Sequence, residues 1–165
     1  MSFSSFFADI LATIIGGAIL TFFFFLIKEK LFSLPNISGK WYFQTNTVET
    51  QYNPYRNMTL EYTAIIWKEG NRVEGTIEKI YENSSTGIRN IEGKNRKRST
   101  FQGNLERKYF QSSLLQLHVN ENAEGRESTT YYELKVKSKD NLDGVFNSMI
   151  AEQSGTTIWQ RTPFH

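Results

Sequence analysis

The chain has 165 residues, a formal net charge of +2, 15% aromatic residues and no cysteine. Such a small charge argues against binding to a DNA or RNA polymer. Without cysteine there is no disulfide, no thiolate zinc site and no cysteine nucleophile, which agrees with a reducing compartment. The two histidines, His118 and His165, are too few for a histidine-rich metal site, so we expect no metal and no cofactor.

The first element in chain order is an uncharged apolar run from Ile10 to Ile27. As a helix it would reach roughly 27 Å at about 1.5 Å per residue, close to the hydrocarbon thickness of a bilayer. A cleaved signal peptide would need positive residues before the run and a small-residue cleavage site after it. Asp9 precedes the run and Lys-Glu-Lys follows it, so we predict a transmembrane anchor over residues 1–32.

The flanking charges predict the orientation of this anchor. Lys28 and Lys30 lie on its C-terminal side, and no basic side chain precedes it. Because basic flanks are retained on the cytoplasmic side, we expect the rest of the chain to lie in the cytoplasm.

Small residues recur at four-residue spacing along the apolar run. This spacing lets helices approach closely in lipid, and it predicts self-association of the anchor, although small residues are also common in spans that do not associate. The residues that we expect to pack are Ala12, Gly16, Gly17 and Thr21.

After a linker at residues 33–39, the chain shows short alternating segments separated by turn residues, which predicts an all-β domain over residues 40–165. Closing the strands into a barrel would remove exposed edges. We therefore predict an eight-stranded antiparallel up-and-down β-barrel preceded by one transmembrane α-helix. The expected strands are Lys40–Thr47, Met58–Lys68, Arg72–Tyr81, Arg98–Glu106, Phe110–Asn120, Ser128–Lys137, Asn141–Met149 and Thr156–Arg161.

A recurring pattern, apolar-x-Gly-x-apolar, supports closure. It places a glycine and two apolar residues on one face of a strand, and a mid-strand glycine is typical of a sharp bend in a tight barrel. The pattern occurs around Gly39, Gly75, Gly103 and Gly144.

Alternation along the strands predicts which residues point into the barrel. An eight-stranded barrel is just wide enough to be filled by side chains or to hold one small ligand, and these alternatives stay open. The expected inward residues are Trp41, Phe43, Leu60, Tyr62, Ala64, Ile66, Val73, Ile77, Phe101, Leu105, Leu115, Leu117, Tyr132, Leu134, Val136, Leu142 and Phe146.

Gly39-Lys-Trp41 on the first strand and Arg161 on the last resemble the calycin group, the lipocalins and fatty-acid-binding proteins. In those folds a Gly-x-Trp opens the barrel and a basic residue from the final strand packs on the tryptophan. The resemblance implies the barrel architecture over residues 37–163, and it rests on these three positions.

The whole layout, a short N-terminal membrane segment followed by a small β-barrel, resembles the transmembrane β-barrel effectors of bacterial cyclic-oligonucleotide antiphage signalling (CBASS). The matching features are Ile10–Ile27, the Gly-x-Trp opening and the compact meander. The resemblance implies a bacterial inner-membrane protein that binds a cyclic dinucleotide, forms homo-oligomers and disrupts the membrane. That family is often described with two membrane helices, whereas this chain has room for one full span.

A cyclic dinucleotide would need aromatic rings for stacking, cations for phosphate and hydroxyls for hydrogen bonding. For the tyrosines the alternative is a core position with the hydroxyl at the barrel rim, and for Arg161 it is a structural contact with Trp41. The candidate ligand-binding residues are Trp41, Tyr62, Thr130, Tyr132, Ser148 and Arg161.

No catalytic motif or metal-ligand spacing is present in the sequence, so we expect no enzymatic activity. Ile65 and Trp67 are expected to face outward, where they would form an oligomer contact unless the strand is buried on both sides. Three functions remain open: a ligand-gated membrane effector, a membrane-tethered carrier or sensor of an apolar small molecule, and a partner-binding module.

Overall fold

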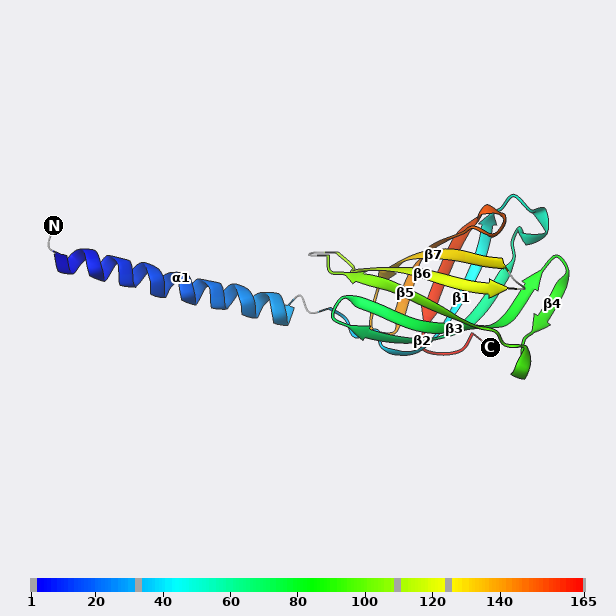
Figure 1. The fold of residues 1–165 in the computed structure, drawn as a ribbon, viewed down its shortest axis with the longest axis horizontal. Helices are drawn as coiled ribbons and strands as arrows, with labels where there is room; N and C mark the ends of the chain where they lie inside the picture. The colour runs from blue at the N-terminus through cyan, green and yellow to red at the C-terminus, as the bar shows by residue number, and fades with distance from the viewer. Residues whose placement is uncertain (1–2, 32–33, 109–110, 124–125, 165) are drawn as a thin grey trace. The chain divides into compact units, whose positions relative to one another are not determined.

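The computed structural model describes residues 3–31, 34–108, 111–123 and 126–164. The chain divides into two compact units, residues 1–33 and 34–165 (Figure 1). Ser33, the first residue of the expected linker, lies outside the described residues. Leu34 and Ile37 belong to the second unit, and Ile37 is fully buried in its core.

The first unit is a single helix, α1, over Phe3–Leu31. Its segment Phe6–Lys28, 23 residues, is long and apolar enough to cross a membrane, and none of its most apolar stretch is buried inside the protein. The hydroxyls of Thr13 and Thr21 donate to the carbonyl oxygens of Asp9 and Gly17, each at 2.8 Å. These bonds satisfy polar groups that lipid could not satisfy.

The second unit contains nine strands and three one-turn 3₁₀ helices among the described residues. All paired strands are antiparallel. The strands are β1 Gly39–Glu49, β2 Thr59–Glu69, β3 Arg72–Ser84, β4 Gly87–Asn90, β5 Arg98–Glu106, β6 Leu114–Ala123, β7 Arg126–Val136, β8 Asn141–Ser148 and β9 Gln153–Gln160. The 3₁₀ helices are η1 Asn53–Tyr55, η2 Gly93–Asn95 and η3 Ile150–Glu152.

Eight of these strands close a barrel in chain order, β1-β2-β3-β5-β6-β7-β8-β9 (Figure 1). The ring closes because β1 pairs with both β2 and β9, for example Phe43 with Tyr62 and with Trp159. The predicted fold class, an eight-stranded up-and-down barrel after one membrane-spanning-type helix, is confirmed.

Some strand boundaries differ from the sequence-based expectation. Strand β4 was not expected, and it forms a hairpin with the part of β3 that extends past its pairing with β5, with Ser84 paired to Gly87. Strand β9 begins at Gln153, three residues before the predicted start. Strand β6 begins at Leu114, and Phe110, its predicted first residue, lies outside the described part of the chain.

At three of the four predicted glycines, the barrel leaves no room for a Cβ. A Cβ on Gly75, Gly103 or Gly144 would overlap a backbone carbonyl oxygen of the neighbouring strand. Gly155 on β9 is a fourth such position that the pattern missed. Gly39 differs, because it starts β1 with φ +109°, a conformation that strains other residues, and does not bend a strand.

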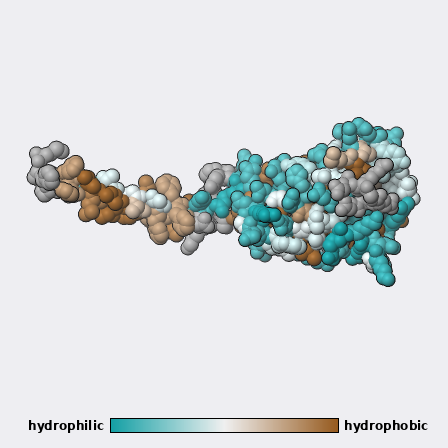
Figure 2. All heavy atoms as spheres, viewed as in Figure 1, coloured by the Kyte–Doolittle hydropathy of each residue, from teal (hydrophilic) through white to brown (hydrophobic). Residues whose placement is uncertain are grey.

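The barrel interior is mostly filled. Every predicted inward residue is buried except Leu60, which is half-buried and packs against the core. The visible face of the barrel is largely polar, in contrast to the apolar surface of α1 (Figure 2). Core residues that alternation did not identify include Ile37, Val119 and Trp159.

We expect Gly144→Ala to lower the free energy of unfolding by about 2 kcal/mol or more, because overpacking of this kind forces backbone shifts. The added methyl would overlap the Glu133 carbonyl oxygen on β7. Thermal unfolding of the full chain in detergent, followed by fluorescence of the three tryptophans, measures the change. Asn147→Ala, at an exposed position on the same strand, is the control, and equal stability of the two variants would contradict the close approach of β7 at Gly144.

Candidate ligand-binding site

Trp41 and Arg161 close the end of the barrel at which β1 begins. The Arg161 guanidinium lies over the Trp41 ring at 3.9 Å, and it donates to the carbonyl oxygens of Lys40 at 2.9 Å and Ser38 at 3.1 Å. The Trp41 indole donates to the Ile37 carbonyl oxygen at 2.7 Å. These contacts join the first and last strands, so the structure gives both residues a role in barrel closure.

Above this closed end, stacked rings fill the middle of the barrel. The Phe43 ring lies between the rings of Trp159 and Tyr62, with centroids at 3.9 Å and 4.6 Å and near-parallel planes. Tyr132 meets Phe43 and Trp159 edge-on at 5.8 Å and 6.0 Å. We call Tyr62, Phe43, Trp159 and Tyr132 the aromatic plug.

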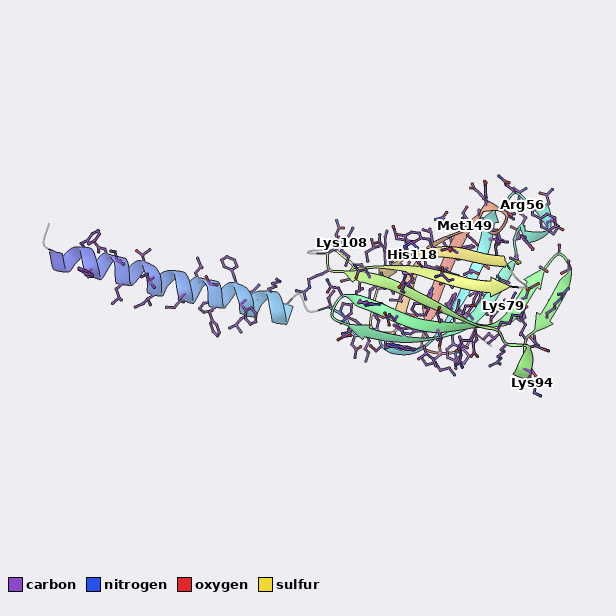
Figure 3. The ribbon with its side chains drawn as sticks, in the orientation of Figure 1. Arg56, Lys79, Lys94, Lys108, His118 and Met149 are labelled. Atoms are coloured by element: carbon purple, nitrogen blue, oxygen red, sulfur yellow. The ribbon has the colours of Figure 1, made fainter. Side chains whose placement is uncertain are left out.

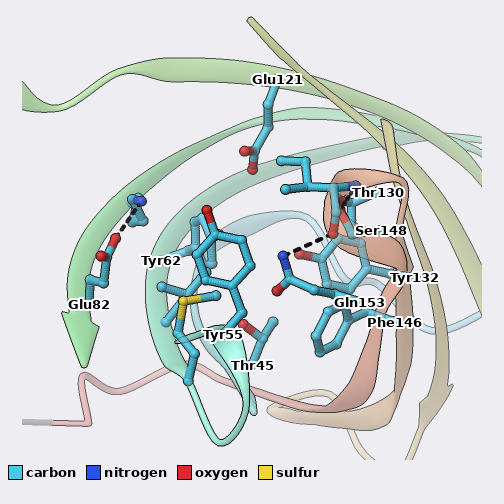
Figure 4. Close-up of a pocket in the computed structure, with 14 residues that line it drawn as sticks. Thr45, Tyr55, Tyr62, Glu82, Glu121, Thr130, Tyr132, Phe146, Ser148 and Gln153 are labelled. Carbon is cyan, nitrogen blue, oxygen red and sulfur yellow. Dashed lines mark hydrogen bonds and ion pairs between the residues drawn. The ribbon is translucent and has the colours of Figure 1, made fainter. Parts of the chain in front are cut away.

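The other end of the barrel holds an inner cavity of about 160 Å³ (Figure 4). Four of the six candidate ligand-binding residues, Tyr62, Thr130, Tyr132 and Ser148, line it. Trp41 and Arg161 do not, because they lie beyond the aromatic plug. The full lining is Thr45, Tyr55, Met58, Leu60, Tyr62, Lys79, Glu82, Glu121, Thr130, Tyr132, Phe146, Ser148, Ile150 and Gln153.

Three charged residues of the cavity were missed by the sequence analysis. Lys79 continues the inward row of Val73 and Ile77 on β3, and Glu121 continues the row of Leu117 and Val119 on β6. Extending the period-2 alternation past the last apolar residue would have found both of them.

Glu82 reaches the cavity for a different reason. A β-bulge in β3 pairs Glu61 with Tyr81 but Tyr62 with Lys79, so that one extra residue, Ile80, has no partner on β2. A bulge of this kind redirects the following side chains, and here it turns Glu82 toward Leu60 and the interior. Alternation alone does not predict such a shift.

Most polar groups of the cavity bind each other. The Thr130 hydroxyl donates to the Ser148 hydroxyl at 3.0 Å, and the Gln153 amide donates to the Ile150 carbonyl oxygen at 3.0 Å. Lys79 and Glu82 form an ion pair at 2.9 Å. These bonds fix the cavity wall before any ligand is present.

Glu121 has no hydrogen-bond or ion-pair partner for its carboxylate within the described part of the chain. Figure 4 shows this carboxylate directed into the cavity, separate from Glu82 and its ion pair. Burial raises the pKa of Glu121, and the positive charge of Lys79 offsets only part of the effect. Burial also raises the pKa of Tyr62 and Tyr132, and Glu121 adds to both shifts, so both hydroxyls stay protonated at neutral pH.

A wider outer space of about 450 Å³ adjoins the inner cavity and shares Tyr62, Lys79, Glu82 and Glu121 with it. Its remaining lining residues are Ile77, Arg89, Ile91, Asn95, Lys97 and Ser99, from β3, β4, β5 and the segment around η2. Figure 3 labels Lys79 and Lys94 at this end of the barrel and Lys108 at the opposite end. The outer space therefore brings in two further cations, Arg89 and Lys97.

One lip of the inner cavity is strained. Ala151 and Glu152, which follow cavity residue Ile150 in η3, have φ values of +52° and +46°. Non-glycine residues in this region cost about 1–2 kcal/mol each, and such strain clusters at functional sites. The Ala151 carbonyl oxygen accepts from the Gln51 backbone amide at 2.9 Å, which ties the lip to the segment after β1.

The remaining predicted contact residues lie outside this site. Ile65 and Trp67 do face outward, at 48% and 51% exposure, and their oligomer contact stays a prediction. On α1, a Cβ added at Gly16 or Gly17 would meet nothing within 4 Å in this chain, and Ala12 and Thr21 are exposed as well. No group of three or more potential metal ligands occurs among the residues that the structure describes.

No protein-family model and no curated protein matches the chain. Among solved structures it is similar to a redesigned β-barrel, at 8% identity and a TM-score of 0.49, over 77% of this chain and 92% of that one. It is also similar to a de novo designed fluorescence-activating β-barrel, at 13% identity and a TM-score of 0.47, over 76% of this chain and 93% of that one. A redesigned barrel bound to DFHBI matches at 10% identity and a TM-score of 0.47, over 76% of this chain and 98% of that one. Likenesses at these levels bear on neither ligand nor function.

We expect Glu121→Gln to raise the melting temperature of the ligand-free protein at pH 7. Because the folded pKa of Glu121 is raised, its ionised form destabilises the fold above that pKa. The penalty disappears as the pH falls through the folded pKa toward the unfolded value of about 4.3, so the two proteins should converge near pH 4. The two proteins share every other ionisable residue, so their difference reports the removal of the Glu121 carboxylate.

Tryptophan-fluorescence melting at pH 7 and pH 4 measures this effect. Glu49→Gln, at an exposed carboxylate of β1, is the control. A Glu121→Gln variant that melts at or below the wild-type temperature at pH 7 would show that the carboxylate has a stabilising partner in the fold.

Proposed function

We propose that the protein is a membrane-anchored effector of antiphage defence whose barrel mouth binds a cyclic dinucleotide. We call the inner cavity and the outer space together the mouth of the barrel. One observation supports the proposal: in this mouth, a hydroxyl-lined cavity large enough for a ring adjoins a space lined by Arg89 and Lys97, which form no ion pair within the described residues. Nucleotides combine the matching parts, a flat base and an anionic phosphate. The anchor-and-barrel layout, which resembles the CBASS effectors, supports the same function.

The outer space is suited to phosphate. Lys79 is already paired with Glu82, whereas Arg89 and Lys97 form no ion pair within the described residues. Both side chains are exposed, and they come from different segments, β4 and the residues before β5. Cations on two sides of an anion form charge-assisted hydrogen bonds, which are stronger than hydrogen bonds between neutral groups. We therefore assign phosphate binding to Arg89 and Lys97.

The size of the two spaces fits the same ligand class. The outer space alone lies within the range of about 300–1,000 Å³ that ligand pockets occupy. The inner cavity is as large as the engineered cavity of roughly 150 Å³ that holds benzene. A ring can therefore enter the inner cavity while the phosphates stay outside.

An apolar cargo fits this mouth less well. The aromatic plug fills the deeper part of the barrel, and the lining of the space that remains includes three charged residues, Lys79, Glu82 and Glu121. Covering charged groups with an apolar ligand removes their water and offers no hydrogen bond, which is unfavourable. A carrier of lipids or other apolar molecules is thus the weaker alternative.

The anchor completes the proposal. We place α1 in the bacterial inner membrane as a single pass, with the barrel in the cytoplasm, because the flanking lysines follow the positive-inside rule. Ligand binding drives homo-oligomerisation through the small-residue face of α1 and the outward pair Ile65 and Trp67, and the assembly disrupts the membrane. The protein acts without catalysis. A partner-binding module that uses Ile65 and Trp67 is the remaining alternative.

We expect a cyclic dinucleotide to stabilise the full chain in lipid nanodiscs, by about 2.7 kcal/mol at a hundred times its dissociation constant. The double variant Arg89→Ala, Lys97→Ala should bind it at least about tenfold more weakly, since each hydrogen bond to a charged group contributes about 1.5–3 kcal/mol. Melting curves and titration calorimetry with a panel of cyclic dinucleotides measure both effects.

The double variant Lys135→Ala, Lys139→Ala removes two exposed lysines elsewhere on the barrel and should bind as the wild type does. Stabilisation by a fatty acid and by no cyclic dinucleotide would favour the apolar carrier and reject the proposal. Equal weakening in both double variants would show that only the net charge matters.

We expect Gly16→Leu together with Gly17→Leu to abolish ligand-dependent association of the full chain, because bulky residues keep helix backbones apart in lipid. Ile15→Leu, an apolar exchange at a neighbouring position, is the control. Cross-linking in proteoliposomes, with and without ligand, gives the fraction of oligomer. Unchanged oligomer in the glycine variant would exclude the helix face as the contact.

A further inference from the structure

Several polar groups of the inner cavity form no hydrogen bond within the described part of the chain. Among them are the Glu121 carboxylate and the hydroxyls of Tyr62 and Tyr132. Other polar groups of the lining are engaged, in the Thr130–Ser148 bond and the Lys79–Glu82 pair. A ligand in this cavity therefore meets an unpaired carboxylate and at least two free tyrosine hydroxyls.

The carboxylate restricts what that ligand can be. An ionised carboxylate only accepts hydrogen bonds, through two oxygens, and leaving it buried without a donor is costly. The part of the ligand that faces Glu121 must supply N–H or O–H donors, preferably two side by side, so that both oxygens are satisfied. A tyrosine hydroxyl can donate, so an acceptor beside those donors would also find a partner.

The shape of the cavity adds a second restriction. Its volume of about 160 Å³ and its lining of Phe146, Leu60 and tyrosine side chains suit a flat ring more than a flexible amine. The Tyr62 ring is held in place by stacking on Phe43 at 4.6 Å, so the wall does not have to order itself on binding. A flat heterocycle with adjacent donors and a neighbouring acceptor satisfies both restrictions.

We infer that the inner cavity recognises a guanine base, with the guanine N1–H and N2–H donating to the two Glu121 oxygens and its O6 accepting from a tyrosine hydroxyl. This inference rests on the proposed function and names the base of its ligand. Adenine presents a ring-nitrogen acceptor beside its amino group. This nitrogen carries no proton, so it would face a carboxylate oxygen without forming a hydrogen bond. Glu121 is thus a specificity-determining residue that excludes adenine as well as binding guanine.

Recognition of guanine would also explain why a carboxylate occupies the position of Glu121, which is unfavourable for the ligand-free fold. Glu121 follows the apolar inward residues Leu115, Leu117 and Val119 on β6, and we expect that a neutral residue in its place would make the ligand-free barrel more stable. Groups that destabilise the empty protein are characteristic of binding sites, because the ligand supplies the missing partner. Guanine would supply that partner through two hydrogen bonds.

Titration calorimetry on the full chain in nanodiscs tests the inference with three probes: cyclic di-GMP, cyclic di-IMP, which lacks the 2-amino group, and cyclic di-AMP. Wild-type protein should bind the guanine probe tightest. Loss of one half of a bidentate base contact should weaken binding of the inosine probe by about tenfold, given about 1–3 kcal/mol of discrimination for such contacts. Glu121→Gln should lose most of this preference, because its amide offers one acceptor and one donor.

The matched control is Glu82→Gln, which changes a cavity carboxylate that is already paired with Lys79 and should keep the guanine preference. Mononucleotide GMP, as a fourth probe, separates recognition of the base from recognition of the cyclic form. Tight binding of all three cyclic probes with equal affinity, unchanged by Glu121→Gln, would overturn the guanine assignment while leaving the proposed function intact. Failure of every cyclic dinucleotide and of GMP to bind the wild type would overturn both.

Discussion

Stacking in the middle of the barrel decides what the two ends can do. The rings of Trp159, Phe43 and Tyr62 lie nearly parallel, and Tyr132 meets the stack edge-on, so the aromatic plug leaves no continuous lumen. Aromatic contacts of this kind add about 0.5–1.5 kcal/mol per pair beyond the burial of their area. The plug separates the Trp41–Arg161 contacts, which close one end, from the polar lining of the cavity at the other end.

The closed end shows how a sequence motif can serve stability and leave the ligand to other residues. Arg161 stacks on Trp41 and donates to two carbonyl oxygens of the chain that leads into β1, which pins the last strand to the first. Gly39, with its positive φ, lets the chain pass close to the guanidinium. The chain enters the barrel at the same end, through Ile37 and Gly39, and these contacts hold its entry point in place.

The open end of the barrel, in contrast, keeps polar groups available for a ligand. Its wall is preorganised by the hydrogen bonds from Thr130 to Ser148 and from Gln153 to the Ile150 carbonyl oxygen. It nevertheless retains the Glu121 carboxylate, which has no partner among the residues that the structure describes, and a rim with two strained residues. Preorganisation reduces the entropy lost on binding, and an unpaired group supplies selectivity, since only a ligand with the right donors can compensate it. In an effector, coupling such a mouth to assembly in the membrane would require that the bound and free barrels differ in how they associate.

The sequence by itself determined the apolar N-terminal helix, the number of barrel strands, most of the inward-facing residues and three of the glycines at which a Cβ has no room. These properties depend on local composition and on the period of two along a strand, which a single segment carries. Only the tertiary structure decided which inward residues meet a partner across the barrel: Trp41 and Arg161 close one end, whereas Tyr62 and Tyr132 border a cavity at the other. It also decided that a bulge at Ile80 turns Glu82 inward, and that Glu121 lines the same cavity with no partner among the described residues. Alternation gives the face of a strand but not the depth along the barrel axis, because depth depends on register with strands that are distant in sequence.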